Sequence, residues 1–344
     1  MYDELKSDQK HIKYNNYCVL PNIIWGTENG QERISQILHI SSNIMDGRVV
    51  DQVNNWNGPV SMTIVLINQD HYHCVLQKLK DFLSNNVLLQ RYLRVHLMFP
   101  SSWSETCQPE FKASTCNISK LTHQELASYP VNTARNAARM FSPAKYILIA
   151  DFEHLFSRNF ERDVLKIART MLQKGSKHLL VYRIFEVAED AKEPADKKDL
   201  EELMKERKAI VFHGTFSKSH AIPRLEEWFA ENGTENGIFW ENVPYTRHGW
   251  EPQFVSSSDI PMHDVNFPFL IRDNTVLRWE LCRAGYQLDV LSNHFMYHKG
   301  IKRAMAQKAQ ALNHWKFSKA LKAWNARMDT EYLDTKHKCP RGSY

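Results

Sequence analysis

A short apolar segment that ends in two carboxylates constrains this chain more than any other feature. Residues 146–150 read Tyr-Ile-Leu-Ile-Ala and are followed directly by Asp151, Phe152 and Glu153. A continuous apolar run of this length is typical of a strand that is buried on both faces of a parallel sheet. Ligands of such sheets bind beyond the carboxyl ends of the strands, which is where we expect Asp151 and Glu153.

The spacing of the two acids suits a divalent cation. Residues i and i+2 of an extended segment point to the same side, so Asp151 and Glu153 would offer two hard oxygen ligands together. Mg²⁺ and Mn²⁺ prefer such ligands. The alternative is a strand that simply ends in solvated acids, and the short motif by itself does not exclude it.

Composition excludes several classes of protein. The chain has 344 residues, of which 43% are hydrophobic and 24% charged, so it is long enough for a large globular core. Its formal net charge of +5 is small and its basic residues are scattered, which argues against nucleic acid as a partner. No stretch approaches the roughly 20 apolar residues of a membrane span, and the N-terminus has no apolar signal core.

Two features point instead to a luminal protein. Asn117-Ile118-Ser119 and Asn232-Gly233-Thr234 are acceptor sequences for N-glycosylation if the chain enters the secretory pathway. The six cysteines show no zinc-binding spacing. Cys107 and Cys116 flank a predicted loop and could form a disulfide, although six free thiols fit the spacing equally well.

Strand and helix signals alternate ahead of the acidic pair. Strands are predicted at 60–67 and 92–99 and helices at 71–83 and 131–140, and the strand at 146–150 completes a β-α-β-α-β unit. Such a unit forms a parallel sheet of the nucleotide-binding type. The chain contains neither GxGxxG nor GxxxxGK[ST], so a classical dinucleotide fold and a P-loop are both disfavoured.

The helix that precedes this strand carries a polar face. Asn132, Arg135, Asn136 and Arg139 recur at i, i+3, i+4 and i+7, which places them on one side. A solvated surface is one explanation. The functional hypothesis is a face turned toward the sheet edge, where its amide and guanidinium groups would lie near Asp151 and pair with carboxylates or phosphates.

Five segments, in order, carry the strongest signal: Trp56-Asn57-Gly58-Pro59-Val60-Ser61; Tyr129-Pro130-Val131-Asn132 through Arg139; Asp151-Phe152-Glu153; Trp250-Glu251-Pro252 with Pro261 and Asp264; and Glu280-Leu281 through Gly285 to His298-Lys299-Gly300. Their order and spacing resemble glycosyltransferase family 49, the LARGE-type and beta-1,4-glucuronyltransferase-like enzymes. The resemblance implies an α/β fold of the GT-A type, with a mixed, mainly parallel sheet flanked by helices. It also implies a UDP-sugar donor, a glycan or glycoprotein acceptor, and inversion at the anomeric carbon, with glucuronate as one candidate sugar.

The resemblance divides the chain into three parts. An N-terminal extension is expected at 1–37, the glycosyltransferase domain at 38–302, and a C-terminal helical tail packed on that domain at 303–344. Family members are usually anchored in the Golgi membrane. Because this sequence shows no signal or membrane-spanning segment, we expect a Golgi-luminal domain without an anchor of its own.

The resemblance also assigns the candidate metal and donor site. The Asp-x-Asp motif of the family falls on Asp151 and Glu153, and its late metal-binding histidine falls on His298. The implied cofactor is Mn²⁺ or Mg²⁺, held by these three residues. The polar face of the preceding helix, together with Asp151, would orient the donor.

An inverting transfer needs one general base near the acceptor hydroxyl. Asp264 matches the family pattern and is the candidate, with Glu251 and Glu280 in reserve. The alternative role for Asp264 is that of a turn or cap aspartate.

Two departures from the family pattern concern the site. Glu153 stands where the family has aspartate, and the added methylene extends the carboxylate by about 1.5 Å in a site where ligand distances matter. Residues 271–274, Ile-Arg-Asp-Asn, replace a Gly-aromatic-Asn-Arg/Lys stretch. A non-catalytic family member that binds a glycan or a partner protein is therefore one alternative. A metal-dependent nucleotidyltransferase or phosphohydrolase is another.

Overall fold

The computed structural model describes residues 11–111, 120–302 and 307–344. Cys116 and the N-glycosylation acceptor sequence that begins at Asn117 lie outside the described residues. The strands are β1 (Ile12–Tyr14), β2 (Tyr17–Ile24), β3 (Ile34–Ser41), β4 (Val60–Val65), β5 (Leu93–Pro100), β6 (Tyr146–Ile149), β7 (Leu155–Phe156), β8 (His178–Val187), β9 (Ala209–Val211), β10 (Ile238–Val243), β11 (Gln253–Ser257) and β12 (Gln287–Lys299). The helices are α1 (Arg48–Trp56), α2 (His71–Ser84), α3 (Val87–Tyr92), α4 (His123–Ala127), α5 (Val131–Met140), α6 (Phe160–Met171), α7 (Lys197–Lys205), α8 (Leu225–Ala230), α9 (Thr275–Arg283), α10 (Gln307–Ala311) and α11 (His314–Glu331). Short 3-10 helices lie at Ser101–Trp103 and Leu333–Thr335.

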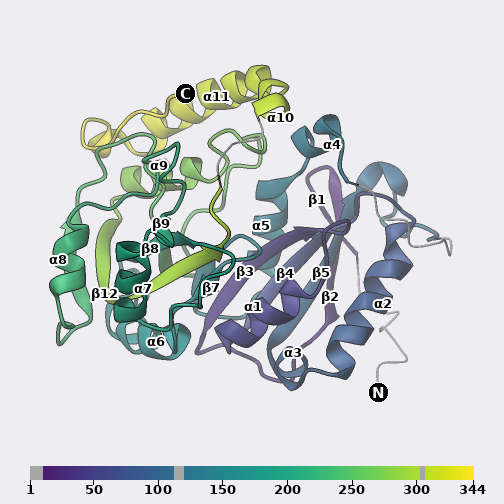
Figure 1. Ribbon diagram of the computed structural model, residues 1–344. Helices are drawn as coiled ribbons and strands as arrows, with labels where there is room; N and C mark the ends of the chain where they lie inside the picture. Colours follow the sequence, from purple (N-terminus) through teal and green to yellow (C-terminus); the bar gives the residue numbers. More distant parts are fainter. Residues whose placement is uncertain (1–10, 112–119, 303–306) are drawn as a thin grey trace.

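The sheet is mixed and has a parallel centre (Figure 1). Its strand order is β1-β2-β5-β4-β3-β6-β11-β8-β12-β10, and β7 and β9 pair with β12 and β8. The run β5-β4-β3-β6 is parallel, as is the pair β8-β12, whereas β11 is antiparallel to both β6 and β8. The predicted α/β class with a mixed sheet and flanking helices is confirmed. Since β6 and β8 run in the same direction, their carboxyl ends lie at the same edge.

Alternate residues of β6 enter different cores, which explains the continuous apolar run. Leu148 packs in the core that contains Trp56 of α1, whereas Ile147 and Ile149 pack in the core that contains Ala138 of α5. All residues of β6 are buried. The prediction of a strand buried on both faces is therefore confirmed, and helices cover the sheet on both sides.

Part of the predicted N-terminal extension belongs to the sheet. β2 pairs with β5 from Tyr17 opposite Pro100 to Ile24 opposite Val95, and β1 pairs with β2. β3 already begins at Ile34, ahead of the predicted domain start at residue 38. The boundary at 37 is therefore corrected. β1 has only three residues and β2 is interrupted by Pro21 and Asn22, so this hairpin lacks the continuous apolar run that identified the central strands.

The C-terminal helix α11 lies beside α9 (Figure 1). Its Phe317 and Trp324 share a core with Trp279 of α9, and the ring centroids of Trp279 and Trp324 are 5.4 Å apart. A disulfide between Cys282 and Cys339 joins α9 to the segment that follows α11. Among the described helices, none has the length and apolar composition needed to cross a membrane.

Cys107 is neither paired with Cys116 nor a free thiol, the two possibilities that the sequence left open. Cys107 forms a disulfide with Cys18, 89 residues away in the sequence, and not with Cys116. Cys18 lies in β2 opposite Phe99 of β5, so the loop after β5 passes directly beside it. No cysteine in the described ranges is free. Structural disulfides of this kind are typical of proteins in oxidising compartments.

Acid is expected to destabilise the fold through His96, which is fully buried in β5. Its Nδ1 accepts from the backbone N–H of Asn22 at 2.9 Å, and its Nε2 lies 2.9 Å from the Ser61 hydroxyl oxygen. Burial, and then the charge of Arg94, lower its pKa from 6.5 to about 3. The unfolded chain therefore binds more protons between these two values, so stability falls as the pH drops through that window.

We expect His96 to account for about 2–3 kcal/mol of lost stability between about pH 7 and pH 4. Urea unfolding of the wild type and His96→Gln, measured across this range, tests the expectation. Glutamine keeps a donor and an acceptor without a titratable proton, so its stability should fall less steeply. Equal slopes in the two proteins would contradict it.

Candidate functional site

A cavity of about 880 Å³ opens at the carboxyl edge of the sheet, and we call it the carboxyl-edge cavity. It is lined by His39 and Ser41 at the end of β3, by Asp151 after β6, and by Ile184 near the end of β8. Parallel strands that end together leave their following residues facing one hollow. The volume is in the range of cavities that hold cofactors and substrates.

Asp151 projects into this cavity, and its side chain is 54% exposed. Its Oδ1 accepts a hydrogen bond from Arg135 Nη2 at 3.1 Å and lies 3.6 Å from His39 Nε2. Partial loss of hydration inside the cavity opposes the negative charge, but the contact with His39 and the guanidinium of Arg135 outweigh it and hold the pKa of Asp151 well below its usual value. Asp151 is consequently ionised at neutral pH.

Arg135 of α5 links two carboxylates across the cavity floor. The residue is 3% exposed, and its Nη1 donates to Asp273 Oδ2 at 2.9 Å and to Asn132 Oδ1 at 3.1 Å. Burial disfavours the guanidinium charge, yet the charges of Asp151 and Asp273 raise the pKa of Arg135. Burial raises the pKa of Asp273 although Arg135 opposes the shift. The pairing fixes the position of Asp151 without neutralising it fully.

The other members of the polar face do not reach Asp151, which corrects the prediction for them. Asn132 Nδ2 donates to the carbonyl of Asp264, and Asn136 Nδ2 to the carbonyl of His263, each at 2.9 Å. Arg139 donates to the carbonyls of residues 260 and 261, each at 2.8 Å. These three side chains hold the backbone of residues 260–264, so their contacts are structural. Arg135 alone of the four contacts Asp151.

Glu153 lies in a turn and not in an extended segment. Its φ is 85°, which is uncommon for a residue with a side chain, and its backbone N–H donates to Gln52 Oε1 at 3.0 Å. The i, i+2 spacing predicted that Asp151 and Glu153 point to the same side of an extended segment. Because Glu153 lies in a turn, this prediction does not hold. Oε1 pairs with Arg48 of α1, and Oε2 lies 3.1 Å from His298 Nε2. Burial opposes ionisation of Glu153, but His298 and Arg48 outweigh it and lower its pKa.

The ring of His298 is oriented by a backbone carbonyl. Its Nδ1 lies 3.1 Å from the carbonyl oxygen of Gly300 and so donates to it, which turns Nε2 toward Glu153. A ligating histidine is usually held through its other nitrogen in this way. In the described ranges, however, no group of three or more His, Cys, Asp or Glu side chains is arranged to hold a metal ion. Glu153 and His298 meet, and Asp151 stands apart from them, paired with Arg135.

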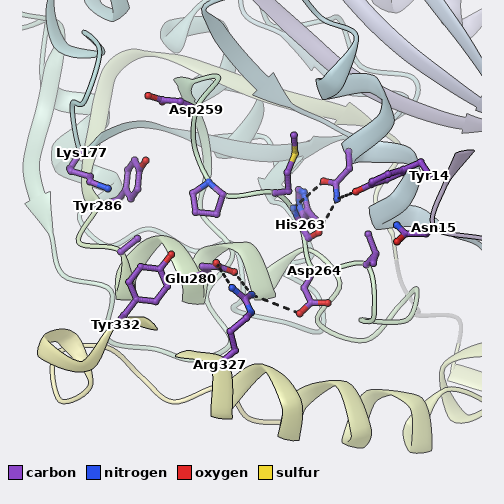
Figure 2. Close-up of a pocket in the computed structure, with 15 residues that line it drawn as sticks. Tyr14, Asn15, Lys177, Asp259, His263, Asp264, Glu280, Tyr286, Arg327 and Tyr332 are labelled. Carbon is purple, nitrogen blue, oxygen red and sulfur yellow. Dashed lines mark hydrogen bonds and ion pairs between the residues drawn. The ribbon is translucent and has the colours of Figure 1, made fainter. Parts of the chain in front are cut away.

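The predicted base, Asp264, lies outside the carboxyl-edge cavity. It lines a second cavity together with Glu280, and Figure 2 shows both carboxylates beside Arg327. Asp264 Oδ1 accepts from the backbone N–H of Asn266 at 2.9 Å. Asp264 therefore has the role of a turn aspartate, the alternative that the sequence left open. Of the three acids considered from the sequence, Glu251 alone lines the carboxyl-edge cavity.

Glu251 is held from two sides. Its Oε1 accepts from the Thr275 hydroxyl, and its Oε2 lies 3.8 Å from His220 Nε2. The side chain is 20% exposed and faces the cavity. A carboxylate that is fixed yet open to a cavity is suited to accept a proton from a bound hydroxyl group.

Sequence reasoning missed three side chains that hold the acids of this cavity. His39 contacts Asp151, Arg48 pairs with Glu153, and Asp273 shares Arg135 with Asp151. Asp273 belongs to residues 271–274, which depart from the family pattern. This departure was the one sequence signal that could have pointed to Asp273. His39 and Arg48 stand in segments without a recognisable motif.

Several known proteins are similar to this chain. The family model described as "Glycosyl-transferase for dystroglycan" matches residues 33–333. Beta-1,4-glucuronyltransferase 1 of Danio rerio is 31% identical over 182 residues, which cover 51% of this chain and 41% of that protein. The Mus musculus protein of the same name is 24% identical over 331 residues, 89% of this chain and 75% of its own length. A crystal structure of S. aureus TarS 1–349 in complex with UDP-GlcNAc superposes with a TM-score of 0.46 at 10% identity, covering 89% of this chain and 69% of that one.

Proposed function

This chain belongs to glycosyltransferase family 49. On that premise we propose that its fold is of the GT-A type and that it transfers a sugar from a UDP-sugar donor to a glycan acceptor. The observation that carries the proposal is the position of Asp151. It follows β6 at the carboxyl edge of the sheet, in a cavity of about 880 Å³, and a buried arginine fixes it as an anion. Donor diphosphates of α/β proteins bind at this edge.

The donor set fits a divalent cation in its chemistry. Asp151 and Glu153 supply carboxylate oxygens, and His298 supplies a ring nitrogen whose partner nitrogen is already bound by Gly300. Carboxylate and imidazole are ligands that Mn²⁺ accepts. We propose that Asp151, Glu153 and His298 would hold Mn²⁺ or Mg²⁺, which when bound would neutralise charge on the donor diphosphate. Arg48 also binds Glu153, so the ion would compete with this arginine.

We assign the proton transfer to Glu251. The acceptor hydroxyl oxygen attacks the anomeric carbon of the donor sugar, and the bond from that carbon to the diphosphate oxygen breaks. The bonding electron pair leaves with UDP, and the hydroxyl proton passes to the Glu251 carboxylate. Arg135 keeps Asp151 in place throughout, because both of its guanidinium arms are fixed by hydrogen bonds. Attack from the side opposite UDP inverts the anomeric centre.

Glucuronate is the first donor sugar to test. Relatives that are named beta-1,4-glucuronyltransferase 1 support this choice. Arg272 and Lys302 line the carboxyl-edge cavity and would pair with the sugar carboxylate.

A non-catalytic role in glycan or partner binding is the second candidate. The ion pair between Arg48 and Glu153 favours it, because this arginine occupies the carboxylate that the metal would need. Such a protein would keep the cavity and lose turnover.

Calorimetric titration of UDP in Mn²⁺, and then in EDTA, separates the two candidates. For an active transferase we expect UDP binding that EDTA abolishes. His298→Ala should weaken it at least about 10-fold, because even the loss of a residue that only supports a metal ligand costs about 10–100-fold. His337→Ala removes an exposed histidine of the tail and should bind as the wild type does. Absence of UDP binding in the folded wild type would move the assignment to the non-catalytic role. Where binding is found, a donor screen with UDP-glucuronate follows.

We propose that the protein works in the Golgi lumen. The disulfides Cys18–Cys107 and Cys282–Cys339 support an oxidising compartment. Asn232 is exposed in the loop after α8.

Secretion from eukaryotic cells is therefore expected to give a chain glycosylated at Asn232. Peptide-N-glycosidase F should lower its mass, and Asn232→Gln should remove one glycan. An Asn117→Gln background ensures that the remaining shift belongs to Asn232. An unmodified Asn232 in secreted, folded protein would refute this expectation.

A further inference from the structure

A second cavity, of about 610 Å³, lies at the opposite edge of the sheet, and we call it the amino-edge cavity. Lys177 and Tyr286 line it and directly precede the parallel strands β8 and β12. Asp259 also lines it and follows β11, which runs antiparallel to β8. All three therefore sit at the amino ends of β8 and β12, whereas Asp151 sits beyond a carboxyl end. The two cavities are distinct sites.

The chain ends contribute to the amino-edge cavity. Tyr14 and Asn15 come from the hairpin of β1 and β2, ahead of residue 33 where the family match begins. Tyr332 follows α11 and faces the cavity near Tyr286 (Figure 2). The cavity is thus assembled partly from a segment that the family match does not include.

Hydrogen bonds and a disulfide hold two parts of this cavity's wall in place. The Tyr14 hydroxyl accepts from Asn136 Nδ2 at 3.1 Å. The backbone carbonyl of Tyr332 accepts from Arg283 Nη2 at 2.8 Å, and the Cys282–Cys339 disulfide closes the same segment. A site whose walls are already ordered loses little conformational entropy when it binds a ligand.

The charges of the cavity disfavour an anionic ligand. Arg327 binds both oxygens of Glu280 at 2.8 Å and lies 3.9 Å from Asp264 Oδ2. Lys177 Nζ lies 4.5 Å from the ring centroid of Tyr286. With Asp259 included, the carboxylates outnumber these two cations, and both cations already have partners. Asp264 and Asp259 line the cavity, and carboxylate oxygens are acceptors that suit hydroxyl donors.

We propose that the amino-edge cavity binds a neutral oligosaccharide, separately from the carboxyl-edge cavity. Tyrosine rings offer flat apolar faces to sugar C–H groups, and the neighbouring carboxylates accept from sugar hydroxyls. The hollow is open and mixed in polarity, as a site for a hydrated chain must be. The binding does not depend on the transfer activity, so it holds whether or not the chain is catalytic.

Isothermal calorimetry with cellotriose, xylotriose and N,N′,N″-triacetylchitotriose, without donor or metal, tests the proposal on the whole chain. We expect at least one of them to bind. Tyr286→Ala and Tyr332→Ala should each weaken that binding by about 3–10-fold, the range of a lost aromatic contact. Asp151→Ala, in the other cavity, should leave it unchanged.

Three results would overturn the proposal. One is the absence of binding by every trisaccharide to the folded wild type. Another is binding that Asp151→Ala abolishes while Tyr332→Ala leaves it intact, because the sugar would then occupy the carboxyl-edge cavity. The third is tighter binding of an anionic hyaluronan tetrasaccharide than of any neutral probe. Tyr286 and Tyr332 are both only partly buried, so both variants are expected to fold, and each tests the proposal independently of the other.

Discussion

Replacing Asp151 with alanine is expected to lower kcat/KM for UDP-sugar turnover by about 10²–10³-fold, the effect of removing one preorganised electrostatic group from an active site. The wild-type carboxylate is ionised and fixed by Arg135, so little reorganisation is needed when the donor binds. The variant should remain folded, because Asp273 still pairs with Arg135 at 2.9 Å. Release of UDP, followed at a fixed Mn²⁺ concentration, measures the effect.

Two further variants show whether charge is the cause. Asp151→Asn keeps an oxygen for Arg135 and removes the charge, so it should lose about as much activity as the alanine variant. Asp81→Ala removes an exposed carboxylate of α2 and should behave as the wild type does. If Asp151→Ala retained more than about a tenth of the wild-type kcat/KM, Asp151 could not have the assigned role.

The position of Asp151 was predictable because its signal is local. A continuous apolar run requires burial on both faces, and in an α/β sheet that places the following residue at the carboxyl edge. β6 meets this condition, with Leu148 in one core and Ile147 in the other. The start of α4 depends on a local signal as well, because Thr122 and Glu125 form a capping box there.

The partners of the polar face of α5 were not predictable from spacing. The i, i+3, i+4, i+7 pattern shows that four side chains share a face, but not which segment covers it. That segment is the backbone of residues 260–264, more than 100 positions later in the chain. Polar side chains that bind carbonyls and polar side chains that bind a ligand have the same sequence pattern.

Asp264 was misplaced because order along the chain is not order in space. It stands between Asp151 and His298 in the sequence, yet β11 runs antiparallel to β6 and β8 and carries the following residues toward the opposite edge. Glu251 precedes β11 and therefore stays at the carboxyl edge. One antiparallel strand separates the two candidate bases, and single-sequence periodicity does not reveal strand direction.

Arg135→Ala is expected to lower the free energy of unfolding by about 3–5 kcal/mol near neutral pH, because it leaves the buried carboxylate of Asp273 without its partner. Most of this loss is expected to come from Asp273, whose side chain is only 13% exposed and would keep an unpaired charge. Arg139→Ala is the matched control on the same helix face. It also removes a buried guanidinium, but the groups that this guanidinium binds are backbone carbonyls and not carboxylates.

The pH dependence distinguishes these two losses. Burial already raises the pKa of Asp273, and Arg135 is the main influence that lowers it, so removing Arg135 raises this pKa further. The folded variant then binds more protons than the unfolded chain above the usual aspartate pKa, and its stability falls as the pH rises through the new value. Urea unfolding at about pH 5 and about pH 8 should therefore show a gap between the wild type and Arg135→Ala that widens with pH. The gap for Arg139→Ala should stay constant, and a constant gap for both variants would mean that Arg135 stabilises the site by packing and not by its charge.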